Sequence, residues 1–386
     1  MKAGRADGIT FEWVEGEAAV EALEGEWRAL EGRLPDRMVF SCFDHMIAWY
    51  RHMGGAHGRP LIGVARNGDG VIGIAPLALR EATIGRVPVR TIDSACHDGD
   101  AGELLFLASD RSALNGLFRA LLARGGFDVM ILCGLRPGGW RHEAVLAAAG
   151  EKGIRTYDIA YQYATIDLSN GYEGYFENLS AKVRGNLRRR LKRAEGLGGI
   201  SLDRLSRPTD SGTLRSYMDR MFRIYERSWK ASGQPPLQDH HRLYYMDVAE
   251  RFNARNMLDL SFLTVGGRDA AFILGYREGT TYYDGTISYD EEFAVVSPGT
   301  LLIQEVARRV AAEGVRLLVS HGDREYKKFW VSQWVPQTRT MVFARGARPA
   351  LAYFSRIELP KWIERMRGGG RSAEAKPVSP EDASEA

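Results

Sequence analysis

The segment 321–330 carries the densest group of side chains that could do acid–base chemistry. Tyr326 could protonate a leaving thiolate, and His321 could relay a proton because imidazole titrates near neutral pH. Lys327 could hold a phosphate or an acidic group. The segment follows an apolar run that predicts a buried strand, and open α/β folds place ligand groups at such strand ends. The alternative is structural: Asp323 caps a short helix and the lysines face solvent.

A second stretch could bind phosphate. Ser297, Pro298, Gly299 and Thr300 follow an aromatic run, 281–288, that predicts a strand. Pro and Gly set a tight turn that opens a helix, whose first N–H groups are unpaired and carry about half a positive charge. Such a helix start favours a pyrophosphate. The alternative is an ordinary helix start, because Ser and Thr are favoured N-caps.

Aromatic residues could line a groove for an acyl group or its acceptor, although core packing explains most of them. These aromatic residues are Trp229, Tyr244, Tyr245, Tyr282, Tyr283 and Trp334. The predicted substrate-binding residues are Trp229, Tyr283, Asp284 and Arg188.

The composition is that of an ordinary globular protein, with 386 residues, 45% of them hydrophobic, and a net charge of +3. This charge alone implies no polyanionic partner. Three widely spaced cysteines, Cys42, Cys96 and Cys133, lack metal-ligand spacing and predict free thiols and no metal site. No Gly-x-Ser-x-Gly or Gly-x-x-x-x-Gly-Lys-Ser/Thr motif occurs, which disfavours a serine hydrolase and an NTPase. No signal peptide or membrane-spanning run is recognisable, so we expect a cytoplasmic protein.

The order of predicted elements is the same in both halves: helices, a strand meander, a helix, a buried strand and a helix. In the first half we expect helices at 17–32, 44–53, 112–124 and 140–149, and strands at 60–66, 71–80, 87–93, 103–107 and 127–133. In the second half we expect helices at 172–196, 209–232, 240–253, 300–313 and 324–331, and strands at 200–205, 258–265, 270–276, 281–288, 315–320 and 339–344. Asn67-Gly68 and Gly266-Gly267 predict hairpin turns. The fold class is therefore α/β, with two lobes that each contain a mixed, mostly antiparallel sheet flanked by helices.

The predicted domains follow from this repeat. We expect an N-terminal lobe over 1–165, a C-terminal lobe over 166–346, an amphipathic helical segment over 347–367 and a disordered tail over 368–386.

These motifs, in their order and spacing, resemble the BioF2-like/CelD-type acetyltransferase family of the GNAT superfamily. The resemblance extends over residues 172–344 and is carried by Ser297-Pro-Gly-Thr, Gly322-Asp-x-x-Tyr326-Lys327, the basic run 180–193 and Tyr225-Glu-Arg-Ser-Trp229-Lys. The family is similar to the Fem-type transferases, which have two GNAT-like lobes.

The resemblance implies a coenzyme A (CoA) thioester donor and acyl transfer to an amine or hydroxyl. It implies that Ser297, Pro298, Gly299 and Thr300 face the CoA pyrophosphate, and we add Lys327 as a cofactor contact. It also implies a reacting centre bordered by Gly322, Asp323, Tyr326 and Lys327, with His321, Asp323 and Tyr326 as the catalytic candidates. The sequence departs from the family pattern at Leu318 and Val319, where an acid is common, and at His321, where Arg is common.

The basic run 180–193 predicts a helix with one apolar stripe. Val183, Leu187 and Leu191 recur every four residues, and the other faces, including Arg188, are nearly all positive. A solvated face explains this pattern. The functional alternatives are an anionic acceptor, the CoA 3′-phosphate or an acidic lipid surface. Nucleic acid is disfavoured, because no nucleic-acid-binding motif accompanies the run.

The segment 347–367 places aromatic and aliphatic residues among cations. Packing onto the core and binding at a membrane interface both explain this pattern. If both basic segments met an anionic membrane surface, the protein would be peripheral to the inner membrane and the acceptor could be a lipid amine such as a sphingoid base.

We therefore predict an acyltransferase that uses acyl-CoA and acylates an amine or hydroxyl, such as a lipid amine or a polysaccharide precursor. The amine attacks the thioester directly, and a backbone N–H of the strand 282–288 holds the oxyanion. Tyr326 is the predicted acid, and His321 or Asp323 the base. One alternative is a Fem-type transferase that uses aminoacyl-tRNA. The other is a non-catalytic accessory protein of envelope polysaccharide or lipid synthesis.

Overall fold

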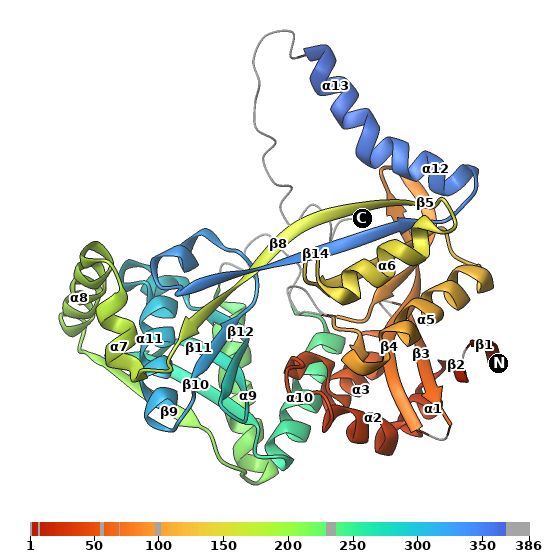
Figure 1. Ribbon diagram of the computed structural model, residues 1–386. Helices are drawn as coiled ribbons and strands as arrows, with labels where there is room; N and C mark the ends of the chain where they lie inside the picture. Colours follow the sequence, from red (N-terminus) through yellow and green to blue (C-terminus); the bar gives the residue numbers. More distant parts are fainter. Residues whose placement is uncertain are drawn as a thin grey trace. The chain divides into compact units, whose positions relative to one another are not determined.

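The computed structural model describes residues 2–6, 8–54, 58–68, 70–96, 102–228 and 237–367. The chain forms two compact units (Figure 1), the first made of Met1–Tyr161 and Pro336–Ala386 and the second of Gln162–Val335. The second boundary differs from the predicted one: residues 336–346, expected in the second lobe, belong to the first unit. The reason is that strand β14 (Gln333–Phe343) pairs with β7 (Val129–Leu135). Trp229 and the predicted disordered tail lie outside the described residues.

The first unit contains one mixed sheet. Its strands are β1 (Lys2–Ala6), β2 (Ile9–Glu15), β3 (Arg59–Asn67), β4 (Gly70–Ile84), β5 (Val87–Ser94), β6 (Leu105–Phe106), β7, most of β14 and the start of β8 (Arg155–Asp167). Neighbouring strands pair antiparallel from β1 to β5, β6 pairs with β4, and β5 and β7 are parallel. The helices are α1 (Glu17–Glu21), α2 (Glu24–Glu31), η1 (Val39–Ser41), α3 (Phe43–His52), η2 (Ala108–Asp110), α5 (Arg111–Arg124), α6 (Trp140–Gly150), α12 (Ala347–Tyr353), η5 (Phe354–Glu358) and α13 (Leu359–Arg367).

The second unit also contains a mixed sheet, in the order β8-β13-β12-β11-β10-β9. Its strands are the end of β8, β9 (Ile200–Leu205), β10 (Leu258–Val265), β11 (Arg268–Glu278), β12 (Thr281–Tyr289) and β13 (Leu317–Ser320). Only the β12–β13 pair among these described strands is parallel. The helices are α7 (Gly171–Asn178), α8 (Ala181–Glu195), α9 (Ser211–Glu226), α10 (Asp239–Ala254), η3 (Glu291–Val296), α11 (Pro298–Ala312) and η4 (Glu325–Phe329). The predicted α/β fold class, with two lobes of mostly antiparallel sheet, is confirmed.

The two faces of the second sheet carry different helices, because successive side chains of a strand point to opposite faces. Ala271 and Ile273 of β11 belong to one core cluster with residues of α7, α8 and α11. Their neighbour Tyr276 packs edge-on against Phe252 of α10, with ring centroids 4.6 Å apart. Helices α9 and α10 thus cover the face opposite to α11.

The predicted hairpin between β10 and β11 is confirmed at Gly266 and Gly267, which have φ of 56° and 77°. Residues that have a side chain rarely adopt this left-handed backbone conformation, so glycine is favoured at such a two-residue turn. Within the described ranges, no helix combines the length and apolarity that crossing a membrane requires.

Candidate active site

The parallel strands β12 and β13 separate partway along β12. Their pairing runs from Thr281–Leu317 to Asp284–Ser320. Strand β13 ends there, whereas β12 continues to Tyr289. Beyond Asp284, therefore, the edge of β12 that faced β13 has no strand partner among the described strands.

A β-bulge lies at the same point of β12. Leu274 of β11 pairs with Thr286 and Gly275 pairs with Asp284, so Gly285 is the extra residue. A Cβ at Gly285 would lie 2.5 Å from Cε2 of Tyr276 and 2.9 Å from the Leu274 carbonyl oxygen, which leaves room only for glycine. Bulges bend a strand and re-aim its groups, and they are frequent beside active sites.

A buried hydrogen-bond chain lies where the strands separate. The Ser320 hydroxyl donates to Oδ2 of Asp284 at 2.6 Å, and Nζ of Lys327 donates to the Ser320 Oγ at 2.9 Å and to the His321 carbonyl. Asp284, Ser320 and Lys327 are 5%, 0% and 2% exposed. Oδ1 of Asp284 is buried and has no hydrogen-bond partner among the described residues. A buried acceptor of this kind calls for a water molecule or a ligand group.

The predicted acid, Tyr326, lies in η4 beside this chain. The residue as a whole is 39% exposed. Burial of the phenol group raises the pKa of Tyr326 well above its usual value, and the nearby Asp284 carboxylate raises it further. Tyr326 therefore keeps its proton at neutral pH and can donate it. His321 and Asp323 are half-buried in the loop before η4, and the His321 ring lies 5.5 Å from the ring of Tyr163.

Side chains of α7 and α11 fix the end of η4. The Tyr175 hydroxyl donates to the Trp330 carbonyl at 2.7 Å and accepts from Gln304 Nε2 at 3.1 Å. Tyr172 donates to the other end of the Gln304 amide at 3.1 Å. Since Tyr172, Tyr175 and Gln304 are all buried, this network holds the segment of Tyr326 and Lys327 in place.

The predicted phosphate-binding turn opens helix α11 as expected. Ser297 adopts a left-handed conformation, with φ of 52°, and its carbonyl accepts from the N–H groups of Thr300 at 3.0 Å and Leu301 at 3.3 Å. Pro298 has no N–H, so the first N–H of α11 that has no acceptor within the helix is that of Gly299. A Cβ at Gly299 would lie 3.7 Å from Ile287 and Tyr289, which places the helix start beside the C-terminal end of β12.

A small pocket of about 40 Å³ lies beside this helix start. Its lining residues are Val183, Asn186, Leu187, Arg190, Thr300, Phe329 and Trp330. Arg190 of α8 is half-buried, and its burial lowers the pKa of the guanidinium. The Trp330 ring also lies 6.3 Å from that of Tyr326, so the pocket adjoins the catalytic candidates.

The structure brings together most of the predicted site residues in the second unit. Asp284, Tyr326 and Lys327 meet at the strand separation, and Thr300 lines the pocket at the helix start. Tyr283 is buried on the opposite face from Asp284, because adjacent strand residues point apart. Trp229 is not among the described residues.

Two predicted ligand contacts lie elsewhere than expected. Lys327 is buried with its ammonium bonded to Ser320 and His321, so in this structure it supports the site from inside and does not reach a phosphate. Arg188 is exposed on α8 and does not line the pocket, whereas Arg190 does.

Sequence reasoning missed Ser320, Arg190 and Gly285. Position at the end of a buried strand could have indicated Ser320. A helical wheel that places Arg190 beside Leu187 and Val183 could have separated it from the exposed arginines. The bulge at Gly285 depends on pairing with β11, which no local pattern shows.

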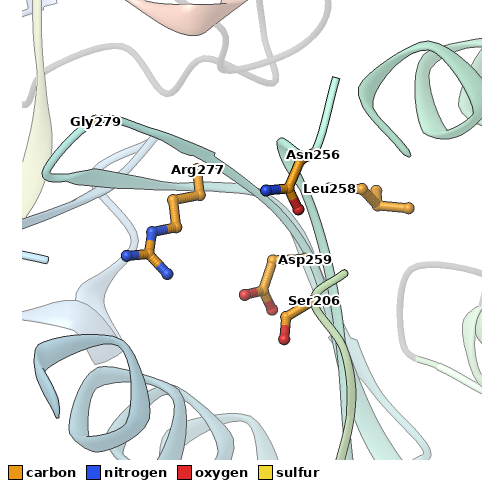
Figure 2. A pocket seen from close by; sticks show the side chains of 6 residues that line it. All are labelled: Ser206, Asn256, Leu258, Asp259, Arg277 and Gly279. Carbon is orange, nitrogen blue, oxygen red and sulfur yellow. The ribbon is translucent and has the colours of Figure 1, made fainter. Parts of the chain in front are cut away.

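A second pocket lies at the other end of β12 (Figure 2). Its lining residues are Ser206, Asn256, Leu258, Asp259, Arg277 and Gly279, and its volume is about 310 Å³. Asp259 accepts both Nε and Nη2 of Arg204, and Arg277 donates to Glu313 at 2.8 Å. The charges of this pocket are therefore already paired, and none of the predicted site residues lines it.

Solved structures match the chain over most of its length. The crystal structure of FemX is 10% identical and covers 87% of this chain and 98% of its own, with a TM-score of 0.56. A conserved protein of unknown function from Bacteroides thetaiotaomicron is 11% identical, with coverages of 86% and 99% and a TM-score of 0.56. The C-terminal domain of a putative lysylphosphatidylglycerol synthetase from Agrobacterium fabrum is 14% identical, with coverages of 93% and 100% and a TM-score of 0.51. At these identities the likeness shows the fold.

A search of curated proteins finds no sequence match. Residues 181–328, however, match a family model described as an acetyltransferase (GNAT) domain. This stretch includes α8, the bulged strand β12, the start of α11 and the segment from His321 to Lys327. The predicted resemblance is thereby confirmed for residues 181–328 of the second unit, which match the acetyltransferase (GNAT) domain.

Proposed function

We propose that the protein is an acyltransferase that takes its acyl group from an acyl-CoA bound in the second unit. The observation that carries this proposal is the separation of β12 from β13 at the Asp284–Ser320 pair, with the bulge at Gly285. Strand β13 ends there, β12 continues to Tyr289, and the buried Asp284–Ser320–Lys327 hydrogen bonds lie at the same point. The pantetheine arm of an acyl-CoA is extended and carries amide groups, so it can lie along the edge of a strand.

The proposed donor lies with its pyrophosphate at the start of α11. Ser297, Pro298, Gly299 and Thr300 provide the turn, and the N–H of Gly299 points out of the helical ladder. Arg190 adds a cation in the adjoining pocket, and no ion-pair partner is found for it among the described residues. A helix N-terminus and a half-buried guanidinium together complement a phosphate group.

In the proposed reaction, the amine nitrogen of the acceptor attacks the carbonyl carbon of the thioester. A backbone N–H of β12 beyond Gly285 holds the oxyanion. The C–S bond then breaks, and Tyr326 donates its phenolic proton to the leaving thiolate. His321 or Asp323 takes the proton that the amine loses. This base then gives a proton to the phenolate of Tyr326, which restores both groups. Oδ1 of Asp284 accepts a hydrogen bond from the attacking amine.

The acceptor in this proposal is an amine or hydroxyl of a lipid or of a polysaccharide precursor. A second candidate is transfer from aminoacyl-tRNA, as in Fem-type transferases. The exposed Arg188, Arg189 and Lys192 of α8 favour this candidate, because they offer unburied positive charge to a polyanion. A third outcome is a site that binds no donor and serves an accessory role.

Thermal unfolding of the purified protein with CoA thioesters of rising acyl length tests the donor. A ligand at about a hundredfold above its Kd stabilises the folded state by about 2.7 kcal/mol, which gives a measurable rise in Tm. No shift with any CoA species contradicts the proposal. A shift with aminoacyl-tRNA that nuclease abolishes would then favour the second candidate, and no shift with either would favour the accessory role.

Arg190→Gln is the matched test of the donor's position. We expect it to weaken CoA binding about tenfold, the usual loss for one charge-assisted hydrogen bond. Arg188→Gln, two residues away on the exposed face, should leave the Kd within about twofold. Equal losses for both variants, measured by isothermal titration, would mean that the whole helix acts only through its net charge.

A further inference from the structure

The helical segment α12-η5-α13 presents an unusual group of exposed apolar side chains. They are Leu351, Phe354, Trp362 and Met366, which are 55%, 50%, 55% and 69% exposed. Leu351 and Phe354 are three residues apart, and Trp362 and Met366 are four apart, so each of these two pairs lies on one side of its helix. Figure 1 shows α12 and α13 as parts of one helical rod.

The opposite side of this segment is already anchored. Ala352 and Ile357 are buried, and Ala352 packs in a cluster with Ile84, Val87 and Phe343 of the first unit's sheet. A Cβ at Gly85 would lie 2.3 Å from Oγ of Ser355, so the β4–β5 turn contacts the helix closely. The segment therefore has one face committed to its own unit and one apolar face left over.

Cations flank the exposed apolar face. Arg356 and Arg365 have no ion-pair partner among the described residues, and Lys361 has an ion pair with its near neighbour Glu358, at 3.5 Å, and lies 5.6 Å from the ring centroid of Tyr157. Along residues 347–367 there are five Lys or Arg against two Glu. Apolar side chains with a cationic border are the pattern of a helix that lies in the interface of an anionic bilayer.

We propose that this face of α12-η5-α13, with Leu351, Phe354, Trp362 and Met366, docks the protein onto the surface of an anionic phospholipid membrane. The charge decides between this occupant and a second copy of the chain. Two copies would bring the same cationic borders together, whereas an anionic headgroup layer neutralises them. Trp362 and Phe354 suit the headgroup level, where aromatic rings are favoured.

Sedimentation of the full-length protein with vesicles tests the proposal. We expect binding to vesicles of phosphatidylcholine mixed with phosphatidylglycerol to exceed binding to phosphatidylcholine alone by on the order of tenfold at low salt. Added salt should reduce the difference, because it screens exposed charges. No binding to the anionic vesicles, or equal binding to both kinds, overturns the proposal.

Variants separate the helix face from other exposed apolar residues. We expect the combined change Leu351→Ser, Phe354→Ser, Trp362→Ser and Met366→Ser to remove the binding to anionic vesicles. Leu243→Ser with Val295→Ser, each 55% exposed in the second unit, is the matched control and should bind as the unaltered protein does. Because the altered side chains are at least half exposed, each variant should keep its Tm.

Two outcomes contradict the proposal. One is a face variant that still binds anionic vesicles like the unaltered protein. The other is a dimer, seen by light scattering without lipid and lost in the face variant, which assigns the face to a second copy. Vesicle binding is measured without any acyl donor, so its outcome does not depend on the proposed acyltransferase activity.

Discussion

Among the strands that the structure describes, each unit has one parallel pair, β5–β7 in the first and β12–β13 in the second, and the two pairs end differently. In both, the last paired residue of the leading strand is a buried aspartate, Asp93 or Asp284. In the first unit the connection continues past Asp93, because the backbone N–H of Cys133 donates to the Ser94 hydroxyl at 3.0 Å. In the second unit the described β13 stops at Ser320 while β12 runs on.

The charges around the two aspartates differ as well. Asp93 pairs with the guanidinium of Arg80, which is a cation of the neighbouring strand β4. Asp284 accepts a hydrogen bond from a neutral hydroxyl, that of Ser320, and in both carboxylates Oδ1 has no hydrogen-bond partner among the described residues. The difference between the two carboxylates is therefore the partner of Oδ2, which is a cation for Asp93 and a neutral hydroxyl for Asp284.

The helices that follow the two leading strands begin differently. Helix α5 begins after Asp110, whose negative charge repels an anion, whereas α11 begins after Ser297 with Pro298 and Gly299. The same order of elements thus gives two different strand pairs. In the first unit a hydrogen bond continues the contact between β5 and β7 beyond the last paired residues, and in the second unit β12 runs on past the end of β13. We interpret the first unit as a support and the second as the seat of the chemistry.

The largest effect should come from replacing each of the two aspartates by asparagine in separate variants. We expect Asp284→Asn to lower kcat/KM for acyl transfer about 100-fold, since it removes a charged group from the reacting centre. Asp93→Asn should leave kcat/KM within about twofold and reduce the free energy of unfolding by about 1–3 kcal/mol, because Arg80 loses its partner. Steady-state kinetics and urea unfolding of both variants measure this. A reversed pattern would place the chemistry in the first unit.

Removal of the buried ammonium should come next. We expect Lys327→Met to reduce the free energy of unfolding by about 2–3 kcal/mol, because Ser320 and the His321 carbonyl lose a charged donor. The adjacent Lys328→Met is the control, with an expected change of about 0.5 kcal/mol or less, since its side chain is 52% exposed. If chemical denaturation showed equal changes for both lysines, the buried hydrogen bonds of Lys327 would contribute nothing to the free energy of unfolding.

The smallest expected effect is a change in the reactivity of the thiol of Cys133, which lies in β7 beside Ser94. The Cys96 side chain and the Arg339 guanidinium lower the pKa of Cys133 to about 6. Burial raises the pKa of Cys42 well above its usual value. Labelling of Cys133 by a small maleimide, which reaches this 7% exposed thiol slowly, should therefore rise as the pH passes through about 6 and level off above it, whereas the fully buried Cys42 stays unlabelled. Mass spectrometry after timed labelling resolves the two sites, and a rise continuing to pH 8.5 would contradict the lowered pKa.

The same shift gives a sign for stability. The pKa of Cys133 in the folded state lies below the usual value of about 8.5 for a thiol. Its contribution to stability is therefore fully present above about pH 8.5 and declines as the pH falls through about 6. The variant Cys133→Ser should lose this part of the pH dependence of the free energy of unfolding.

Local patterns predicted much of this fold. The β10–β11 hairpin followed from its glycines, and helix α5 and the start of α11 lie where periodicity and turn residues indicated. The long helix predicted over 172–196 is broken at Leu179 and Ser180, where Ser180 caps α8 through its bond to the N–H of Val183. The lobe boundary predicted between residues 165 and 166 falls within strand β8.

The candidate site was only partly predictable, for a physical reason. Ser297, Thr300 and Tyr326 were recognisable because their chemistry and local turns are encoded over a few residues. The chain from Lys327 through Ser320 to Asp284 joins residues up to 43 positions apart, and it forms only when β12 and β13 pair. No periodicity distinguishes a lysine that turns inward from one that faces solvent.

The path of the chain through β8 and β14 has a consequence for synthesis on the ribosome. The second unit is one continuous stretch, whereas the first needs residues from both sides of it. The second unit is therefore complete before the first, and strand β7 waits with an open edge until β14 has emerged. An open strand edge in a growing chain invites pairing with other chains, so the first unit is the one that needs protection by chaperones during translation.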